Sequence, residues 1–134
     1  MFSRIGVIGS GAMGRGIVQV FATAGCEVLL YDVRPEAVEQ ALSFNKDLLE
    51  RQVAKGKLSP EQLAQTLARM QPAASLEALA GCDLLIEAIV ENLEAKQGLF
   101  RQLEAIVAPS AVLATNTSSL SVTQIASGCQ HPER

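Results

Sequence analysis

The chain has 134 residues, 49% of them hydrophobic and 19% charged, and its formal net charge at pH 7 is −3. Acidic and basic residues are interspersed, which argues against a nucleic-acid surface, and no apolar run approaches the roughly 20 residues that cross a bilayer. We therefore expect one soluble domain with a small-molecule partner, and neither a nucleic-acid nor a membrane partner. Because residues 1–4 lead directly into the first expected strand, no signal peptide is predicted and the expected location is the cytoplasm.

The first 32 residues have the order of elements that a dinucleotide-binding βαβ unit requires. A strand over residues 4–8 is followed by a glycine-rich turn, a helix that ends at Gly25, and a second strand over residues 28–32. Gly9 can adopt a backbone conformation closed to other residues, Gly11 lets the main chain approach a pyrophosphate, and Gly14 lets the helix lie close to the strand. Unpaired amides and the helix dipole then bind the phosphates. The cofactor-binding residues predicted in this turn are Gly9, Ser10, Gly11, Ala12, Met13 and Gly14.

The spacing of apolar residues predicts which faces of the first two helices are buried. Pro35 suits a helix start, and a long second helix is expected to about residue 54. The sheet-facing residues predicted for the first helix are Gly16, Ile17, Val20, Phe21 and Ala24. The apolar side of the second helix is predicted to hold Val38, Ala41, Leu42, Leu48, Leu49 and Val53.

Asp32 ends the second strand, 18 positions after Gly14. An acid near this offset accepts hydrogen bonds from the adenosine ribose and repels a 2′-phosphate, so NAD is the predicted cofactor rather than NADP. Arg34 leaves the alternative open, because a guanidinium could receive that phosphate. In the structural alternative, Asp32 only caps the next helix and Arg34 is a solvated charge.

A helical hairpin over residues 36–70 stands where a minimal βαβ unit has one short crossover helix. Lys55, Gly56 and Lys57 break the long helix, and residues 59–62 (SPEQ) are a capping-box start for a further helix that carries Leu63, Leu67 and Met70. We expect this insertion to serve the substrate.

The remaining elements complete an open parallel sheet. Strands are expected over residues 71–74, 84–89 and 111–115, with a short helix at 75–80 and a longer one at about 93–107. The expected fold class is α/β, a Rossmann-type doubly wound parallel sheet with the inserted hairpin. Glu91, Asn116 and Ser118 follow carboxyl ends of strands, where ligands bind in such sheets, and should converge with the glycine turn. Five expected strands against six in a full dinucleotide fold suggest the front part of something longer.

Cysteine and histidine usage predicts neither a metal site nor a disulfide framework. Cys26, Cys82 and Cys129 are widely separated and form no C-x-x-C pair, so we expect free thiols in a reducing cytoplasm. His131 is the only histidine and precedes a proline in a polar tail, which favours a surface turn over a catalytic base.

Four motifs in order make the chain resemble the amino-terminal, NAD-binding domain of bacterial L-3-hydroxyacyl-CoA dehydrogenases over essentially its whole length. The phenylacetate-catabolism branch of that family is similar too. The motifs are residues 8–14 (IGSGAMG), 55–58 (KGKL), 83–88 with 91–96 (DLLIEA, ENLEAK) and 115–120 (TNTSSL).

The resemblance implies roles for individual residues. Glu91 and Lys96 would flank the nicotinamide half of NAD, with Asn116 also in the cofactor site, and Ser118 would be the catalytic and substrate-binding hydroxyl that hydrogen-bonds the reacting oxygen. Lys55 or Lys57 would meet the CoA phosphates. The structural alternatives are a helix-surface Lys96, an N-terminal helix acid at Glu91, a turn-capping Ser118 and a solvated lysine pair.

The implied reaction is reversible oxidation of a (3S)-3-hydroxyacyl-CoA to the 3-oxoacyl-CoA, in fatty acid β-oxidation or in aromatic (phenylacetate) catabolism. In the family a histidine in a segment beyond residue 134, paired with a later glutamate, is the base, and a helical carboxyl-terminal domain closes the cleft and supplies most of a homodimer interface. We therefore expect this chain to bind NAD but to be nearly inactive alone. Two alternatives stay open: a β-hydroxyacid dehydrogenase acting on free acids, and a non-enzymatic NAD-sensing module.

Overall fold

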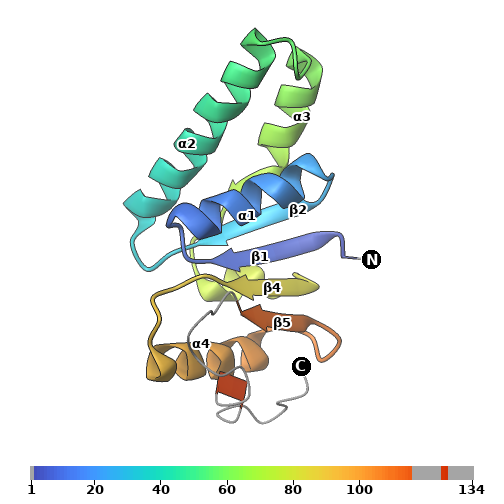
Figure 1. Ribbon diagram of the computed structural model, residues 1–134. Coiled ribbons are helices and arrows are strands. Elements are labelled where there is room, and N and C mark those ends of the chain that lie inside the picture. Colours follow the sequence, from blue (N-terminus) through green and yellow to red (C-terminus); the bar gives the residue numbers. More distant parts are fainter. Residues whose placement is uncertain (1, 116–124, 127–134) are drawn as a thin grey trace.

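A parallel sheet with the strand order β3-β2-β1-β4-β5 runs through the middle of the molecule (Figure 1). The computed structural model describes residues 2–115 and 125–126. The order changes direction between β1 and β4, so the chain crosses from one half of the sheet to the other there. That crossover is where open α/β sheets bind ligands. The strands are β1 (Arg4–Ile8), β2 (Glu27–Tyr31), β3 (Met70–Pro72), β4 (Leu84–Glu87) and β5 (Val112–Thr115).

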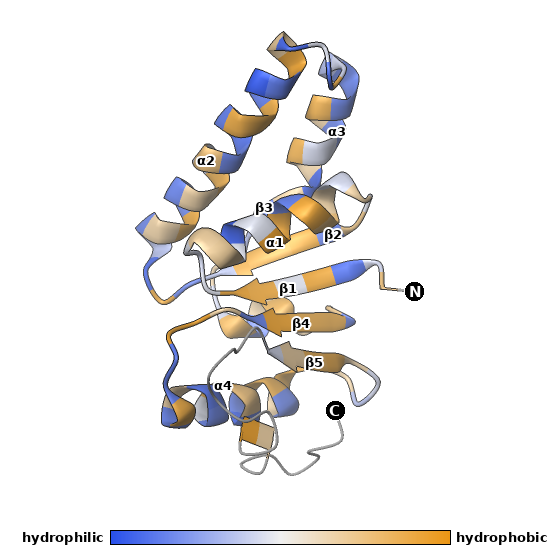
Figure 2. Ribbon diagram, in the orientation of Figure 1, coloured by the Kyte–Doolittle hydropathy of each residue, from blue (hydrophilic) through white to orange (hydrophobic). Residues whose placement is uncertain are grey.

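Helices cover both faces of this sheet, as the alternation of buried side chains along the strands shows. Ile5 and Val7 of β1 belong to one core, together with residues of α1 (Ala12–Thr23) and α2 (Pro35–Ala54). Ile8 belongs to a second core on the other face, with residues of η1 (Leu76–Leu79) and α4 (Leu93–Ile106). Figure 2 shows the central strands as largely hydrophobic and the helices as mixed. The predicted doubly wound α/β fold is therefore confirmed.

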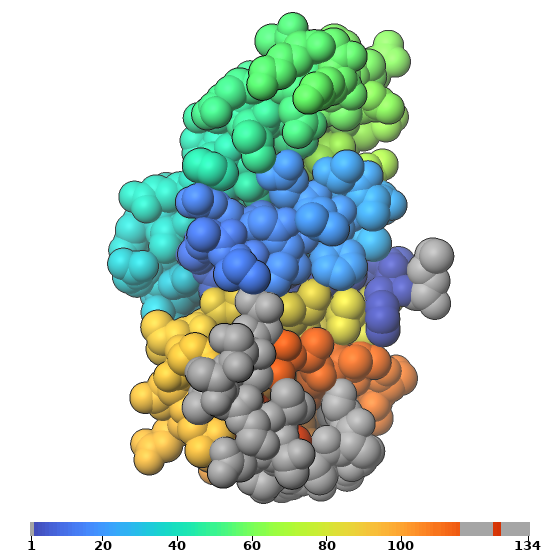
Figure 3. All heavy atoms as spheres, in the orientation of Figure 1, coloured from blue at the N-terminus to red at the C-terminus, as the bar shows by residue number. Residues whose placement is uncertain are grey.

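The helical hairpin is formed by α2 and α3 (Pro60–Arg69) and projects from the β3 end of the sheet (Figure 1). The predicted capping box is confirmed, because Gln62 N donates to Ser59 Oγ at 3.1 Å and Ser59 N donates to Gln62 Oε1 at 2.9 Å. Gly56, at the turn between the helices, has a φ of +73°. On the face of the molecule that Figure 3 shows, α1 lies between the hairpin and the α4–β5 half.

The predicted sheet-facing side of α1 is wrong in detail. Gly14, Val18 and Ala22 are the buried residues of this helix, whereas Val20 is 67% exposed. Of the residues predicted to face the sheet, Ile17 and Phe21 pack against the core only in part. The close contact of Gly14 with the glycine turn sets the rotation of the helix, and the row of residues at four-residue spacing from Gly14 then faces the sheet.

Several other boundaries differ from the prediction by one or two residues. Met70 does not end α3 but begins β3, where it pairs with Val28 and is buried. The helix stops at Arg69, whose Nη1 donates to the Ala22 carbonyl oxygen at 3.0 Å. The fourth strand ends at Glu87, earlier than predicted. Within the described part of the chain, none of the helices is long and apolar enough to span a membrane.

Candidate cofactor site

The turn between β1 and α1 can be built only from glycine at two of its positions. Gly9 has a φ of +109°, and a Cβ there would lie 2.4 Å from the Ala88 carbonyl oxygen. A Cβ on Gly14 would lie 1.7 Å from the Gly9 carbonyl oxygen, so the first turn of α1 rests directly on the turn. A Cβ on Gly11, by contrast, would meet nothing within 4 Å. Gly11 therefore faces open space that a ligand can enter.

The first turn of α1 presents backbone donors to that space. The N-cap residue, Gly11, has no side chain that could accept from the first amides of the helix, and the first turn carries no acidic residue. Because the Arg15 amide is the first to bond within the helix, to the Gly11 carbonyl oxygen at 3.0 Å, the amides of Ala12, Met13 and Gly14 have no acceptor in the helix. A helix N-terminus of this kind suits the pyrophosphate of a dinucleotide.

Asp32 follows β2 and is tied to the glycine turn. Its Oδ2 accepts hydrogen bonds from Ser10 N at 3.0 Å and Ser10 Oγ at 2.7 Å, and its Oδ1 accepts one from Arg34 N at 3.0 Å. Partial burial raises the pKa of Asp32, but the hydrogen bonds from Arg34 and Ser10, with the Arg34 charge, hold it below its usual value. Asp32 does not cap α2, whose N-cap Arg34 makes no side-chain capping bond. The carboxylate is thus ionised at neutral pH and held beside the turn, where a ribose diol can donate to it.

A buried ion cluster lies at the carboxyl ends of β4 and β5. Glu87 and Lys96 are both fully buried, and Lys96 Nζ lies 2.6 Å from Glu87 Oε2 and 3.1 Å from Glu91 Oε1. Glu87 also accepts from Ile89 N at 2.7 Å and from the Thr115 hydroxyl. The cluster links the ends of two strands to the first turns of α4.

The structure brings several of the predicted site residues together. The glycine turn, Asp32 and the Glu91–Lys96 pair lie at the carboxyl edge of the sheet, because Ile8 is in register with both Tyr31 and Glu87. Lys96 is not on the helix surface, so that structural alternative is wrong. Lys55 and Lys57 are exposed at the tip of the hairpin. Asn116 and Ser118 lie outside the described residues, as do Cys129 and His131.

Glu87 is the site residue that the sequence reasoning missed. It stands in an otherwise apolar segment, residues 84–89, that reads as an ordinary buried strand. The signal for it was a lone carboxylate inside such a strand with a lysine nine positions later, because a buried charge needs a partner.

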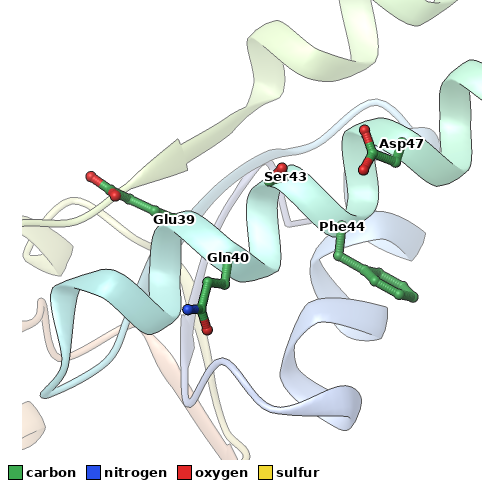
Figure 4. Close-up of a pocket in the computed structure, with 5 residues that line it drawn as sticks. All are labelled: Glu39, Gln40, Ser43, Phe44 and Asp47. Atoms are coloured by element: carbon green, nitrogen blue, oxygen red, sulfur yellow. The ribbon is translucent and has the colours of Figure 1, made fainter.

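A hollow of about 470 Å³ along α2 does not belong to this site (Figure 4). It is lined by Glu39, Gln40, Ser43, Phe44 and Asp47, and the Arg15 guanidinium stacks on the Phe44 ring at 3.7 Å. Two carboxylates and no basic side chain line it, so it does not suit a phosphate.

Comparison with known proteins decides the family. A family model described as "3-hydroxyacyl-CoA dehydrogenase, NAD binding domain" matches residues 4–134. The chain belongs to this family. NAD is the cofactor of this domain, in agreement with the open glycine turn and the acid after β2.

Similar proteins extend well beyond this NAD-binding domain. A 3-hydroxyadipyl-CoA dehydrogenase of Escherichia coli K12 is 46% identical over 97% of the chain, which covers 27% of that relative. A 3-hydroxybutyryl-CoA dehydrogenase of Bradyrhizobium diazoefficiens is 40% identical over 100% of the chain, which covers 46% of it. The crystal structure of 3-hydroxybutyryl-CoA dehydrogenase from Escherichia coli K12 superposes with a TM-score of 0.97 at 44% identity over 99% of the chain and 28% of that structure. The chain thus spans between a quarter and a half of the length of these proteins.

Proposed function

We propose that the chain is the NAD-binding part of a dehydrogenase that interconverts (3S)-3-hydroxyacyl-CoA and 3-oxoacyl-CoA, in fatty acid β-oxidation or in aromatic (phenylacetate) catabolism. The observation that carries the proposal is the cradle at the sheet edge. There the open space at Gly11 faces the free amides of α1 and lies beside an Asp32 carboxylate fixed by Ser10. The names of the two relatives, both acting on a 3-hydroxyacyl-CoA, support the substrate class.

Different residues of this chain bind different parts of the cofactor. The amides of Ala12, Met13 and Gly14 bind the pyrophosphate, and Asp32 accepts from the adenosine ribose. When bound, NAD would supply the acceptor for the hydride that leaves C3 of the substrate. Glu91 and Lys96 line its nicotinamide half.

The remaining contacts to the cofactor and the substrate come from two places in the sequence. Asn116 completes the cofactor site, and Ser118 hydrogen-bonds the reacting oxygen and so polarises the carbonyl in the reverse reaction. Lys55 or Lys57, both exposed at the hairpin tip, meets the CoA phosphates. The domain over residues 1–134, with 36–70 as an inserted hairpin, is then a binding unit, and the general base comes from a segment outside it.

The same proposal covers partners and location. The whole enzyme acts on an acyl-CoA in the cytoplasm, forms a homodimer through a helical domain outside this chain, and has no nucleic-acid or membrane partner. The free thiols of Cys26 and Cys82 support a reducing compartment.

A calorimetric titration of the chain with NADH and, separately, with NADPH tests the cofactor assignment without a substrate. We expect NADH to bind at least about tenfold more tightly, because the Asp32 carboxylate repels a 2′-phosphate. A preference for NADPH would move Arg34 to the phosphate, and no binding of either would overturn the proposal.

A second assay tests whether the general base lies outside this chain. With acetoacetyl-CoA and NADH, the chain should show almost no oxidation of NADH. The group that acts as base in oxidation must act as the general acid in this direction, and losing general acid–base catalysis alone costs about 10²- to 10⁴-fold. Substantial reduction of acetoacetyl-CoA by the purified chain would contradict the location of the base outside it.

A further inference from the structure

Glu87, at the end of β4, joins separate segments of the chain around one buried carboxylate. Within the described residues, its Oε2 accepts from Lys96 Nζ at 2.6 Å and from Ile89 N at 2.7 Å, and its Oε1 accepts from the Thr115 hydroxyl. These donors belong to α4, to the segment after β4 and to the end of β5. Glu87 and Lys96 are both fully buried. One carboxylate therefore fixes these elements relative to one another at the carboxyl edge of the sheet.

Each of these segments leads to a residue that the proposed function places in the site. Lys96, in α4, is itself one of the residues beside the nicotinamide half. The segment after β4 continues to Glu91, whose Oε1 lies 3.1 Å from Lys96 Nζ. Thr115 immediately precedes Asn116 in the sequence. A displacement of the Glu87 carboxylate would therefore reach the nicotinamide side of the site through each of its partners.

The backbone around Glu87 connects these segments to the glycine turn. Glu87 is in register with Ile8, the residue before Gly9. The next residue, Ala88, donates its amide to the Ile8 carbonyl oxygen at 2.8 Å, and the Ala88 carbonyl oxygen would lie 2.4 Å from a Cβ at Gly9. The partners of Glu87 are thus held in a fixed relation to the turn that binds the pyrophosphate.

Stability alone gives a weak reason for burying an ion pair at this place. Removing two charges from water is costly, and a buried ion pair is often no more stabilising than apolar side chains of the same volume. A buried polar network whose hydrogen bonds are satisfied does, however, hold its members in one arrangement. The pair of Glu87 and Lys96 is therefore better explained by the position that it gives to the lysine.

We propose that Glu87 is a positioning residue for the nicotinamide half of the cofactor. It holds the Lys96 ammonium from the buried side, so that the ammonium stays in one place at the carboxyl edge, and it anchors the end of β5 just before Asn116. The adenosine half and the pyrophosphate bind at Asp32 and at the amides of α1, and their binding does not depend on Glu87. The inference rests on the proposed function and deepens it, because it assigns the residue that orders one half of the cofactor site.

The test compares the binding of NADH with that of ADP, which has the adenosine half and the pyrophosphate but no nicotinamide half. In Glu87→Gln the side chain keeps nearly the same shape and can still accept from the Ile89 amide, but the Lys96 ammonium loses its buried counter-charge. We expect the dissociation constant of NADH to rise about fivefold, the effect of one net hydrogen bond, and that of ADP to stay at the wild-type value. Calorimetry measures both ligands, and a merely structural role for Glu87 would weaken both alike.

Asp83→Asn is the matched control. Asp83 precedes β4 at the other end of the strand, where its carboxylate accepts from Ser3 N at 3.1 Å and from Arg4 N at 3.2 Å. This carboxylate also joins two segments of the chain, but it lies away from the carboxyl edge of the sheet. Its loss should lower the Tm and leave the dissociation constants of NADH and ADP at their wild-type values.

The double variant E87Q/K96M keeps the test decisive if E87Q does not fold. It removes both buried charges and replaces the lysine with an apolar side chain of similar length, so neither position holds an unpaired ion. NADH should bind at least about fivefold more weakly to this variant, because Lys96 itself is absent. ADP should again bind as it does to the wild type.

The outcomes separate this inference from the proposed function. Equal losses for NADH and ADP, or no loss for either, would overturn the positioning role of Glu87 while leaving NAD binding in place. The same conclusion would follow if neither variant folds, or if D83N changes the ratio of the two dissociation constants as much as E87Q does. Wild-type chain that binds neither NADH nor ADP would overturn the proposed function and this inference with it.

Discussion

Substituting alanine at Gly11 should weaken cofactor binding without disturbing the fold. Gly11 has φ −69° and ψ −170°, which alanine adopts freely, and the added Cβ would meet no protein atom within 4 Å. Alanine is a poorer N-cap than glycine, by less than about 1 kcal/mol, which lowers the Tm of a chain of this size by at most about 3–5 °C. The methyl group, however, occupies the space in front of the free amides of α1.

The expected loss of affinity follows from those amides. Losing one hydrogen bond to a charged phosphate costs about 2 kcal/mol, so NADH should bind about 30-fold more weakly to Gly11→Ala. Calorimetry gives the affinity and thermal unfolding gives the stability of the same sample. Wild-type affinity in G11A would refute the assignment of this space to the pyrophosphate.

Gly14→Ala is the matched opposite, because its Cβ would lie 1.7 Å from the Gly9 carbonyl oxygen. The helix must then move off the turn, which we expect to cost about 3 kcal/mol and to lower the Tm by about 10 °C. A G14A chain as stable as the wild type would show that the contact between α1 and the turn is not as tight as described.

Three further predictions concern single side chains. Asp32→Asn should weaken NADH binding about tenfold and leave NADPH binding nearly unchanged, measured by calorimetry, because the ribose loses a charged acceptor and the repulsion of a 2′-phosphate disappears. Hydrogen bonds, first from Ser3 N, lower the pKa of Asp83, so its contribution to stability is complete above the unfolded pKa of about 3.9 and is lost as pH falls through the folded value. Asp83→Asn should therefore lower the Tm at pH 7, whereas the variant and the wild type should have the same Tm once the pH is below the folded-state pKa of Asp83. Burial raises the pKa of the Cys82 thiol to about 11, so at pH 8 Cys82 should react with a disulfide reagent only after unfolding, as mass spectrometry of the labelled chain will report.

The parts of the fold that depend on local backbone chemistry were predictable. The glycine turn, the capping box at Ser59 and the helix start at Pro35 each need a specific residue at a specific position, and the structure has all three as expected. The doubly wound order also follows from alternating strands and helices with short connections.

The parts that depend on tertiary contacts were not predictable from spacing alone. Several rows of apolar or small residues on α1 could have faced the sheet, and only the contact between Gly14 and Gly9 selects the row with Val18 and Ala22. In the same way, Glu87 and Lys96 are nine positions apart on a strand and a helix, and only the packing of α4 on the sheet brings their charges together.

The α2–α3 hairpin lies apart from the strand ends that hold the cofactor site. It joins the sheet through the edge strand β3, and its tip, residues 54–57, is exposed. Turns can be added to or removed from the tip without altering the register of β1, β2 and β4, which hold the glycine turn, Asp32 and Glu87. The length of the hairpin, and with it any contact between its tip and a bulky ligand, can therefore be redesigned independently, while the residues at the sheet edge stay unchanged.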